Sequence, residues 1–343
     1  MKKLLLILLC LPMIGFGQEN IKFSETIIVE DLQRHLNILA SDSLEGRETG
    51  KKGQKMAADY IMNHFKNIGI PPYKKKTYYQ KFKVKSGKHL CKCDDCDQSL
   101  VKKIFGSKKK IKGENVLGYI EGTDLKEELI IITAHYDHLG KHDSLIFNGA
   151  DDDGSGTVAV MEIAEAFMLA KKAGQGPRRS VLVMAVSGEE KGLLGSKYYT
   201  DHPIYPLENT VANLNIDMIG RIGDFKENPN YVYLIGADRL SQELHNISEQ
   251  VNKEHIGLEL DYTFNEEDDP NRYYYRSDHY NFAKNNIPVI FYFNGIHEDY
   301  HKVTDTVEKI DFDKIQKITR LIFLTAWELA NRDERIELDK KEN

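Results

Sequence analysis

Five short segments rich in histidine, aspartate and glutamate are spread in order along this chain. They are 134–138 (AHYDH), 149–156 (GADDDGSG), 187–190 (SGEE), 215–218 (NIDM) and 300–306 (YHKVTDT). Imidazole nitrogens and carboxylate oxygens are ligands that zinc takes from proteins, and catalytic zinc sites keep one position open for water. One such segment would mean little, but five together indicate a zinc site that activates water for hydrolysis.

His135 and Asp137 lie two residues apart where a buried strand is expected to end. Alternation along a strand places both on one side. A carboxylate there can accept the second ring N–H of a metal-bound histidine, which fixes the tautomer of the ligand. By itself this pair is more typical of a surface histidine at a strand end, so the assignment depends on the other segments.

The triplet 151–153 places three carboxylates directly before an expected helix. Adjacent carboxylates repel one another unless a cation is close. The positive end of the helix helps, but a helix cap needs only one aspartate. A carboxylate that bridges two metal ions gives the triplet a reason, and we assign the bridge to the middle residue, Asp152.

Glu189 and Glu190 follow another apolar strand. Neighbouring side chains in an extended or bent segment point in different directions, so one can bind metal while the other faces the substrate. This division suits hydrolysis, since a carboxylate that is free of the metal can take a proton from water and deliver it to the leaving amine. Alone, the pair would more often be a solvated loop.

Asp217 and His301 complete the set of candidate ligands. Asp217 ends a largely apolar strand, where a carboxylate without a partner would be costly, so it requires a metal or an ion pair. His301 is less constrained by its surroundings, because His279 and His297 are close in a chain with 12 histidines.

The elements that must position these residues alternate between strand and helix. Expected strands are 78–84, 115–121, 129–134, 180–186, 211–216, 231–235 and 287–293, and expected helices are 29–40, 53–68, 156–173, 195–200, 241–255 and 312–331. Continuous apolar strands that alternate with helices predict an α/β sheet buried on both faces. Ligands of such folds lie at the carboxyl ends of the strands, where all five segments fall.

The N-terminus has the pattern of a secretory signal peptide over residues 1–17. A basic start precedes an apolar stretch from Leu4 to Ile14, and small residues before Gln18 mark the expected cleavage site. We therefore expect export to the periplasm or the extracellular space. Lipidation of Cys10 is less favoured because Leu9 before it is not small. No other apolar run is long enough to cross a bilayer.

The remaining composition is that of an ordinary globular protein. A net charge of −6 over 343 residues argues against nucleic-acid binding through a basic face. Residues 86–112 are rich in lysine and include Cys91, Cys93 and Cys96, so we expect an exposed insertion. For an exported protein, one local disulfide and a spare thiol are favoured there over a metal site. Residues 18–343 are then expected to form one catalytic domain.

Together the segments resemble the secreted co-catalytic zinc exopeptidases, a family that includes bacterial leucyl-type aminopeptidases, glutamate carboxypeptidase and glutaminyl cyclase. The resemblance covers about residues 27–330 and includes 44–47 (LEGR) and 276–279 (RSDH). It implies a single three-layer αβα domain with a mixed, largely parallel twisted sheet, peptide substrates and two zinc ions. Many larger members insert a protease-associated domain where this chain has only residues 86–112, which implies a more open substrate entry.

The resemblance also implies a role for each candidate residue. His135 and Asp217 would bind one zinc, Glu190 and His301 the other, and Asp152 would bridge them, with a cis peptide bond to Asp153. Glu189 would be the general base, Asp137 the partner of His135, and Tyr300 a residue that stabilises the tetrahedral intermediate.

The leading interpretation is an exported metallo-aminopeptidase that hydrolyses the first peptide bond of a peptide. A glutaminyl cyclase with one zinc is less favoured because the intact DDDGSG tract suits two metals. A carboxypeptidase would need a cationic anchor such as Arg221, Arg272 or Arg276. The acidic loop 266–269 is more typical of a solvated loop than of an anchor for the substrate amine. A binding protein without activity is least favoured, since all candidate ligands are present. The sequence leaves open which substrate side chains are preferred and what the oligomeric state is.

Overall fold

The computed structural model describes residues 19–73, 76–85 and 110–340. The predicted signal peptide, Cys91, Cys93 and Cys96, and residues 86–109 of the predicted insertion lie outside the described residues. Within the described ranges, no helix is both long enough and apolar enough to cross a membrane.

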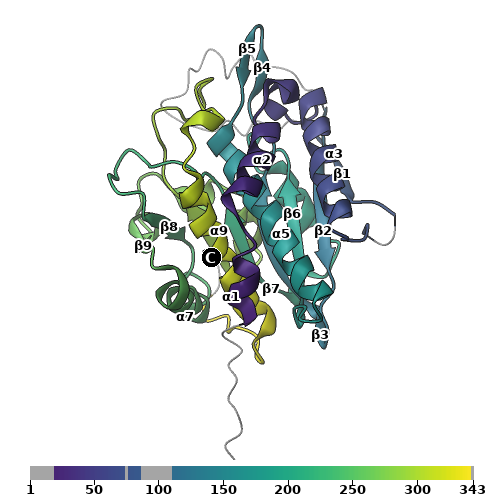
Figure 1. Ribbon diagram of the computed structural model, residues 1–343, viewed down its shortest axis with the longest axis vertical. Coiled ribbons are helices and arrows are strands. Elements are labelled where there is room, and N and C mark those ends of the chain that lie inside the picture. Colours follow the sequence, from purple (N-terminus) through teal and green to yellow (C-terminus); the bar gives the residue numbers. More distant parts are fainter. Residues whose placement is uncertain (1–18, 74–75, 86–109, 341–343) are drawn as a thin grey trace, which may run out of the picture.

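An eight-stranded mixed sheet runs through the molecule in the order β1-β2-β6-β3-β7-β10-β8-β9 (Figure 1). Its strands are β1 (Tyr79–Lys85), β2 (Lys110–Ile120), β3 (Leu125–His135), β6 (Arg179–Val186), β7 (Thr210–Ile216), β8 (Tyr231–Ile235), β9 (Glu259–Asp261) and β10 (Val289–Phe293). The central strands β6, β3, β7 and β10 are parallel, whereas β2 and β8 pair antiparallel with β6 and β10. A separate hairpin of β4 (Gly140–His142) and β5 (Leu145–Phe147) follows β3.

Helices connect these strands. The α-helices are α1 (Glu19–Ser24), α2 (Val29–Leu39), α3 (Lys52–Asn67), α5 (Gly156–Lys172), α6 (Leu194–Asp201), α7 (Gln242–Val251), α8 (His279–Ala283) and α9 (Phe312–Asn331). Single turns of 3₁₀ or π type are η1 (Asp42–Arg47), η2 (Ala150–Ser155), η3 (Leu207–Asn209), η4 (Asn252–Ile256), η5 (Thr263–Asn265), η6 (Tyr273–Tyr275) and η7 (Val307–Lys309).

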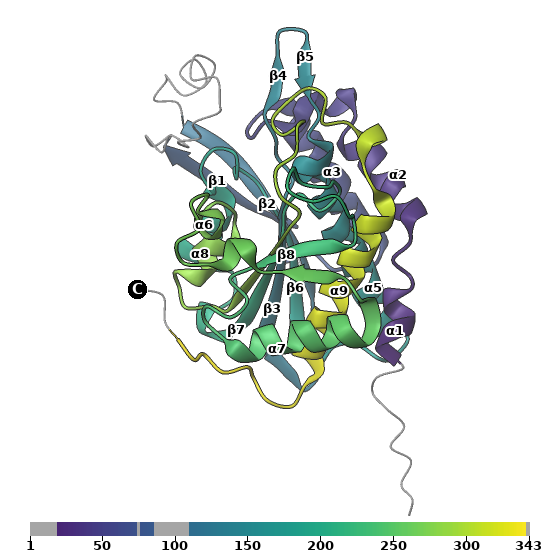
Figure 2. The same cartoon turned by 90° about the vertical axis from the view of Figure 1, so that its left-hand side faces the viewer.

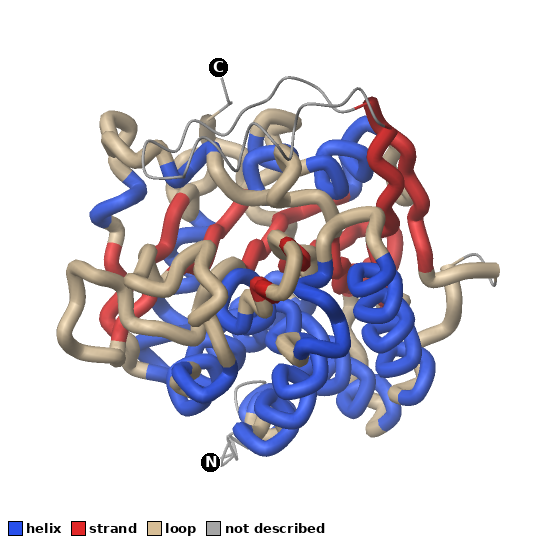
Figure 3. The backbone as a smooth tube through the Cα atoms, turned by 90° about the horizontal axis from the view of Figure 1, so that it is seen from above, coloured by secondary structure: helices blue, strands red, loops and turns tan. Residues whose placement is uncertain are grey.

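The central strands are largely apolar and buried because both faces of the sheet are covered. Along β3, Ile130 and Ile132 pack into the core on one face, while Leu129 and Ile131 pack into the core on the other. Helices α1, α2, α3, α5 and α9 lie on one side of the sheet, and α6 and α8 lie on the other (Figure 2). Seen from above, the strands run between helices on both sides (Figure 3). The predicted α/β fold with a mixed, largely parallel sheet is confirmed.

The structure differs from the sequence-based expectation mainly in short elements and at boundaries. Strand β2 begins at Lys110, within the stretch expected to be an exposed insertion, because Lys110 pairs with Lys85 at the end of β1. The helix expected over 241–255 ends at Val251 and continues as a π turn. Elements α1, β4, β5, β9 and α8 are too short to show a hydrophobic period, so they were not predicted.

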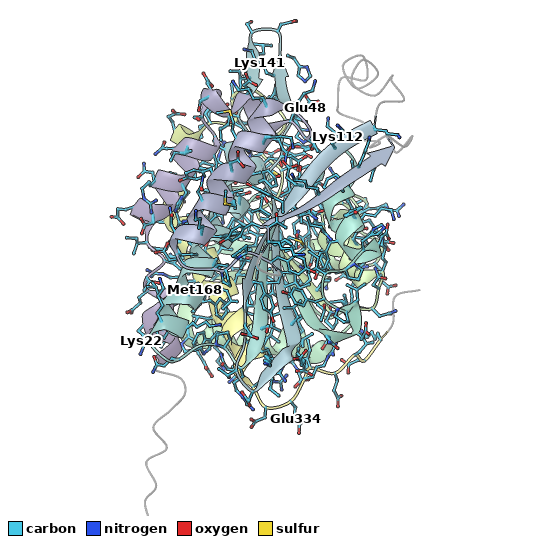
Figure 4. All side chains as sticks on the ribbon, turned by 90° about the vertical axis from the view of Figure 1, so that its right-hand side faces the viewer. Lys22, Glu48, Lys112, Lys141, Met168 and Glu334 are labelled. Atoms are coloured by element: carbon cyan, nitrogen blue, oxygen red, sulfur yellow. The ribbon has the colours of Figure 1, made fainter. Side chains whose placement is uncertain are left out.

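The carboxyl ends of the parallel strands lie together at one end of the sheet. The β4–β5 hairpin, which follows β3, projects from that end of the molecule (Figure 1). Glu48, Lys112 and Lys141 lie toward the same end, whereas Lys22 and Glu334 lie at the opposite end (Figure 4). The five segments predicted to do chemistry therefore follow strands that deliver them to a common region.

Candidate metal centre

Three neighbouring strand ends bring the first segments together. His135 is the last residue of β3 and pairs with Val186 of β6, while Thr133 of β3 pairs with Asn215 of β7. Because these strands are parallel and in register, segments 187–190 and 215–218 emerge beside His135.

The first set of donors consists of His135, Asp217 and Asp152. His135 Nε2 lies 3.5 Å from Asp217 Oδ1 and 3.3 Å from Asp152 Oδ1. Ser277 Oγ donates a 2.7 Å hydrogen bond to Asp217 Oδ2, which leaves Oδ1 directed toward His135. Burial opposes a charge on His135, but the carboxylates of Asp217 and Asp152 outweigh it and raise the pKa of the imidazole well above its usual value.

The second set consists of His301, Glu190 and the other oxygen of Asp152. His301 Nε2 lies 3.1 Å from Asp152 Oδ2 and 3.3 Å from Glu190 Oε2. Burial would raise the pKa of Glu190, but the charge of His301 prevails and lowers it to about 2. Of the three histidines that lie close together in this part of the sequence, 279, 297 and 301, it is His301 that contacts Asp152 and Glu190. His297 instead contacts Asp151, and His279 stacks on the ring of Phe291 at 4.6 Å.

The spacing of the donors fits zinc on each side of Asp152. A tetrahedral zinc with ligand distances of about 2.0–2.2 Å has neighbouring donors about 3.3–3.6 Å apart. Three of the four donor–donor distances given above, 3.3, 3.3 and 3.5 Å, lie in this range, and the fourth, from His301 to Asp152, is shorter at 3.1 Å. Burial together with the carboxylate of Asp217 raises the pKa of Asp153 well above its usual value, so the region has an excess of negative charge that a cation would neutralise.

Each aspartate of the triplet has a different environment. Asp151 Oδ1 accepts the backbone N–H of Gly220 and Oδ2 lies 3.1 Å from His297. Asp153 accepts three backbone N–H groups, those of His135, Gly156 and Met218. Asp153 is close enough to His135 and Asp217 to share a cation, but these hydrogen bonds occupy both of its oxygens. Asp152 alone faces both donor sets, and its peptide bond to Asp153 is cis.

Asp137 lies beside His135, but its carboxylate is not the nearest acceptor. His135 Nδ1 is 3.0 Å from the backbone carbonyl oxygen of Asp137 and 3.9 Å from its Oδ1. The carboxylate instead accepts hydrogen bonds from Thr49 Oγ1 at 2.5 Å and from the backbone N–H of Glu189 at 3.3 Å. The backbone carbonyl of Asp137 therefore orients the ring of His135. The carboxylate of Asp137 connects the segment that contains Glu189 to the end of β3.

Glu189 is half-buried beside the donors and belongs to neither set. Burial and the neighbouring carboxylate of Glu190 raise its pKa well above the usual value, against the opposing charge of His135. A carboxylate with a raised pKa next to a metal site can exchange a proton near neutral pH. Tyr300 stacks on His301 with ring centroids 3.8 Å apart, which places it at the second donor set.

Two further residues at the centre were given no individual role by sequence reasoning. His138 is buried, and its Nδ1 lies 2.9 Å from Glu190 Oε1 and 3.7 Å from Asp152 Oδ2. Its only signal in the sequence is that it closes the segment 134–138. Arg47 is 1% exposed and was expected in a polar turn. Its only signal was the match of 44–47 to the family pattern.

Comparison with known proteins agrees with this geometry. The family model for peptidase family M28 matches residues 115–326, which is more than half of the chain and includes both donor sets. The chain belongs to peptidase family M28. Asp152, His301 and the other donors therefore lie within the part of the chain that defines the family.

Individual relatives are distant. Aminopeptidase YwaD of Bacillus subtilis is 26% identical over 239 residues, which cover 67% of this chain and 47% of the relative, so the chain spans about half of that protein. The LapA aminopeptidase of Legionella pneumophila has a TM-score of 0.69 at 22% identity, over 94% of this chain and 77% of that one. Glutaminyl cyclase of Bacteroides thetaiotaomicron has a TM-score of 0.62 at 15% identity, over 88% and 98%. At these identities the two structures show a shared fold.

Proposed function

We propose that this member of the family is a metallo-aminopeptidase that binds two zinc ions and hydrolyses the N-terminal peptide bond of peptides. The observation that supports it most is the position of Asp152, whose Oδ1 lies 3.3 Å from His135 and whose Oδ2 lies 3.1 Å from His301. A carboxylate that faces two separate donor sets is suited to bridging two metals. Aminopeptidases among the relatives agree with this activity.

Zinc, when bound, lowers the pKa of a water molecule and polarises the scissile carbonyl group. The protein supplies the proton transfers through the carboxylate of Glu189, which takes a proton from the water and delivers it to the leaving amine. Its backbone N–H donates to Asp137 Oδ1, so the base is held in fixed relation to His135. Tyr300, which stacks on His301, would donate a hydrogen bond to the oxygen that gains negative charge.

Two of the cationic residues considered as carboxylate anchors are engaged elsewhere. Arg221 pairs with Asp299 at 3.0 Å, and the guanidinium of Arg272 lies over the ring of Tyr275. Arg272 and the acidic loop 266–269 line a cavity of about 320 Å³ that none of the zinc donors lines. This arrangement disfavours Arg221 and Arg272 as anchors for a terminal carboxylate, and it gives the acidic loop no role in holding the substrate amine.

The test is a panel of amino-acyl anilides, matching N-acetylated anilides and N-terminal glutaminyl peptides, assayed with the zinc-loaded protein. We expect cleavage of free amino-acyl anilides and no cleavage of the acetylated ones. Cyclisation of glutaminyl peptides without anilide cleavage would assign the protein to the cyclases. Release of C-terminal residues from N-blocked peptides would assign it to the carboxypeptidases.

We also propose that the protein is exported and acts outside the cytoplasm. The support is the basic and apolar sequence of residues 1–17. Expression of the full chain in a bacterial host should yield a mature protein that begins at Gln18, as read by N-terminal sequencing of the exported fraction. Retention of Met1 in a protein confined to the cytoplasm would contradict export.

A further inference from the structure

The loop that contains His301 is fastened to the aspartate triplet at two points. This loop, residues 294–306, connects β10 to η7. On one side of His301, His297 Nε2 lies 3.1 Å from Asp151 Oδ2. On the other side, the carboxylate of Asp305 accepts the backbone N–H groups of Asp151 at 3.0 Å and Asp152 at 3.2 Å. The main-chain carbonyl of Asp305 also accepts from Ala150.

These contacts span a strained point of the backbone. His301 has a φ of +57°, in the left-handed region that a non-glycine residue seldom adopts. Such a conformation is strained and persists only where the surroundings fix it. Asp305 and His297 are both buried, and together they fix the loop on either side of His301. Freed of these contacts, the loop would relax, and the imidazole would leave its position 3.1 Å from Asp152.

We propose that Asp305 is a positioning residue, which sets the distance between His301 and the bridging carboxylate of Asp152 and thereby the affinity of the second metal. Asp305 holds the backbone N–H of the bridging residue itself, and it lies four residues beyond His301 on the same loop. The donors of the first set other than Asp152 end β3 and follow β7, so they do not depend on this loop. The inference rests on the proposed two-zinc site.

The test is a stepwise zinc titration of the metal-free protein against a competing chelator, for wild type, Asp305→Asn and Asp305→Ala. Removing groups that orient metal ligands typically costs 10–100-fold in metal affinity. We expect Asp305→Ala to raise the dissociation constant of the zinc at the second donor set, called here the second affinity, by that factor. The fold-change in the dissociation constant of the other zinc should be at least ten times smaller. Asp305→Asn keeps one acceptor oxygen and should give an intermediate value. Circular dichroism and thermal melting establish that each variant is folded.

Asp269→Asn is the matched control. Asp269 is also a buried carboxylate that accepts backbone N–H groups within a loop, those of Asn271 and Tyr273. If loss of such a contact acted only through general stability, this variant would weaken the second metal as much as Asp305→Asn does. We expect it to leave both zinc affinities unchanged.

His297 provides a second, independent pair of variants should Asp305→Ala not fold. A glutamine at 297 can place its amide nitrogen near the position of Nε2, so His297→Gln should keep the second affinity, whereas His297→Ala should lose it. Unchanged second affinity in the folded variants, or equal losses at both sites, would overturn the positioning role alone. A wild-type protein that binds only one zinc would overturn the two-zinc proposal together with it, so the two failures are distinguishable.

Discussion

Glu189→Gln is expected to lower kcat for amino-acyl anilide hydrolysis by about 10²–10⁴-fold, the usual contribution of a general acid–base group. Glutamine has nearly the same shape but cannot accept the proton of the attacking water. Because Glu189 belongs to neither donor set, the variant should keep the zinc content of the wild type. Steady-state kinetics and elemental analysis of the same preparation measure both quantities.

The matched control is Glu48→Gln. Glu48 is a glutamate at the same end of the molecule, and it pairs with Lys191 at 3.1 Å rather than facing the donors (Figure 4). This variant should keep kcat within a few-fold of the wild type. A Glu189→Gln variant with near wild-type turnover would show that another group moves the proton. Loss of zinc in that variant would show instead that Glu189 is a ligand.

Arg47→Met is expected to destabilise the folded protein by about 3–5 kcal/mol, because it leaves several buried carbonyl oxygens without this donor and each such group costs about 1–3 kcal/mol. The guanidinium is fully buried and donates to the carbonyl oxygens of Leu39, Tyr136, Asn148 and Gly149 at 2.6–2.8 Å. Methionine fills part of the space but removes the donor to the carbonyl oxygens of Leu39, Tyr136 and Asn148, whereas Gly149 still accepts the backbone N–H of Gly154. Urea unfolding of the metal-free protein, with the midpoint and slope compared to the wild type, measures the loss.

Arg320→Met serves as the control for this change. Arg320 also donates to main-chain carbonyls, those of Glu25 and Ile27, but it is only half-buried, so water can replace the lost donor. We expect its cost to stay near 1 kcal/mol, the net value of an ordinary hydrogen bond. If Arg47→Met and Arg320→Met lowered the free energy of unfolding equally, the larger contribution expected from the buried guanidinium would be wrong.

Much of the frame of this fold is visible in the sequence because it depends on local patterns. Strands β3, β6 and β7 each contain a largely apolar run, and the segments of interest follow them directly. Parallel strands bring the segments that follow them to one end of the sheet. The sequence alone therefore predicts that His135, Glu190 and Asp217 lie close together. The assignment of the bridge to Asp152 rests on the repulsion among three adjacent carboxylates and on the family resemblance, and the structure shows Asp152 facing both donor sets.

The remainder depends on contacts between distant parts of the chain. Arg47 reads as part of a polar turn, and only the fold shows it enclosed by carbonyls about 90–100 residues away in the sequence. The hydrogen bonds of Asp305 to Asp151 and Asp152 span more than 150 residues and leave no local signature. Whether Asp137 would orient His135 by its carboxylate or its carbonyl likewise depends on the path of the backbone after β3.

The central claim is that two zinc ions lie on either side of Asp152. The most direct test is X-ray diffraction from crystals of the zinc-loaded protein at wavelengths just above and below the zinc absorption edge. We expect two anomalous peaks about 3.5–4 Å apart, the usual separation in two-metal sites, one beside His135 and Asp217 and the other beside Glu190 and His301. A single peak at full zinc loading, or a pair of peaks that does not share Asp152, would contradict the central claim.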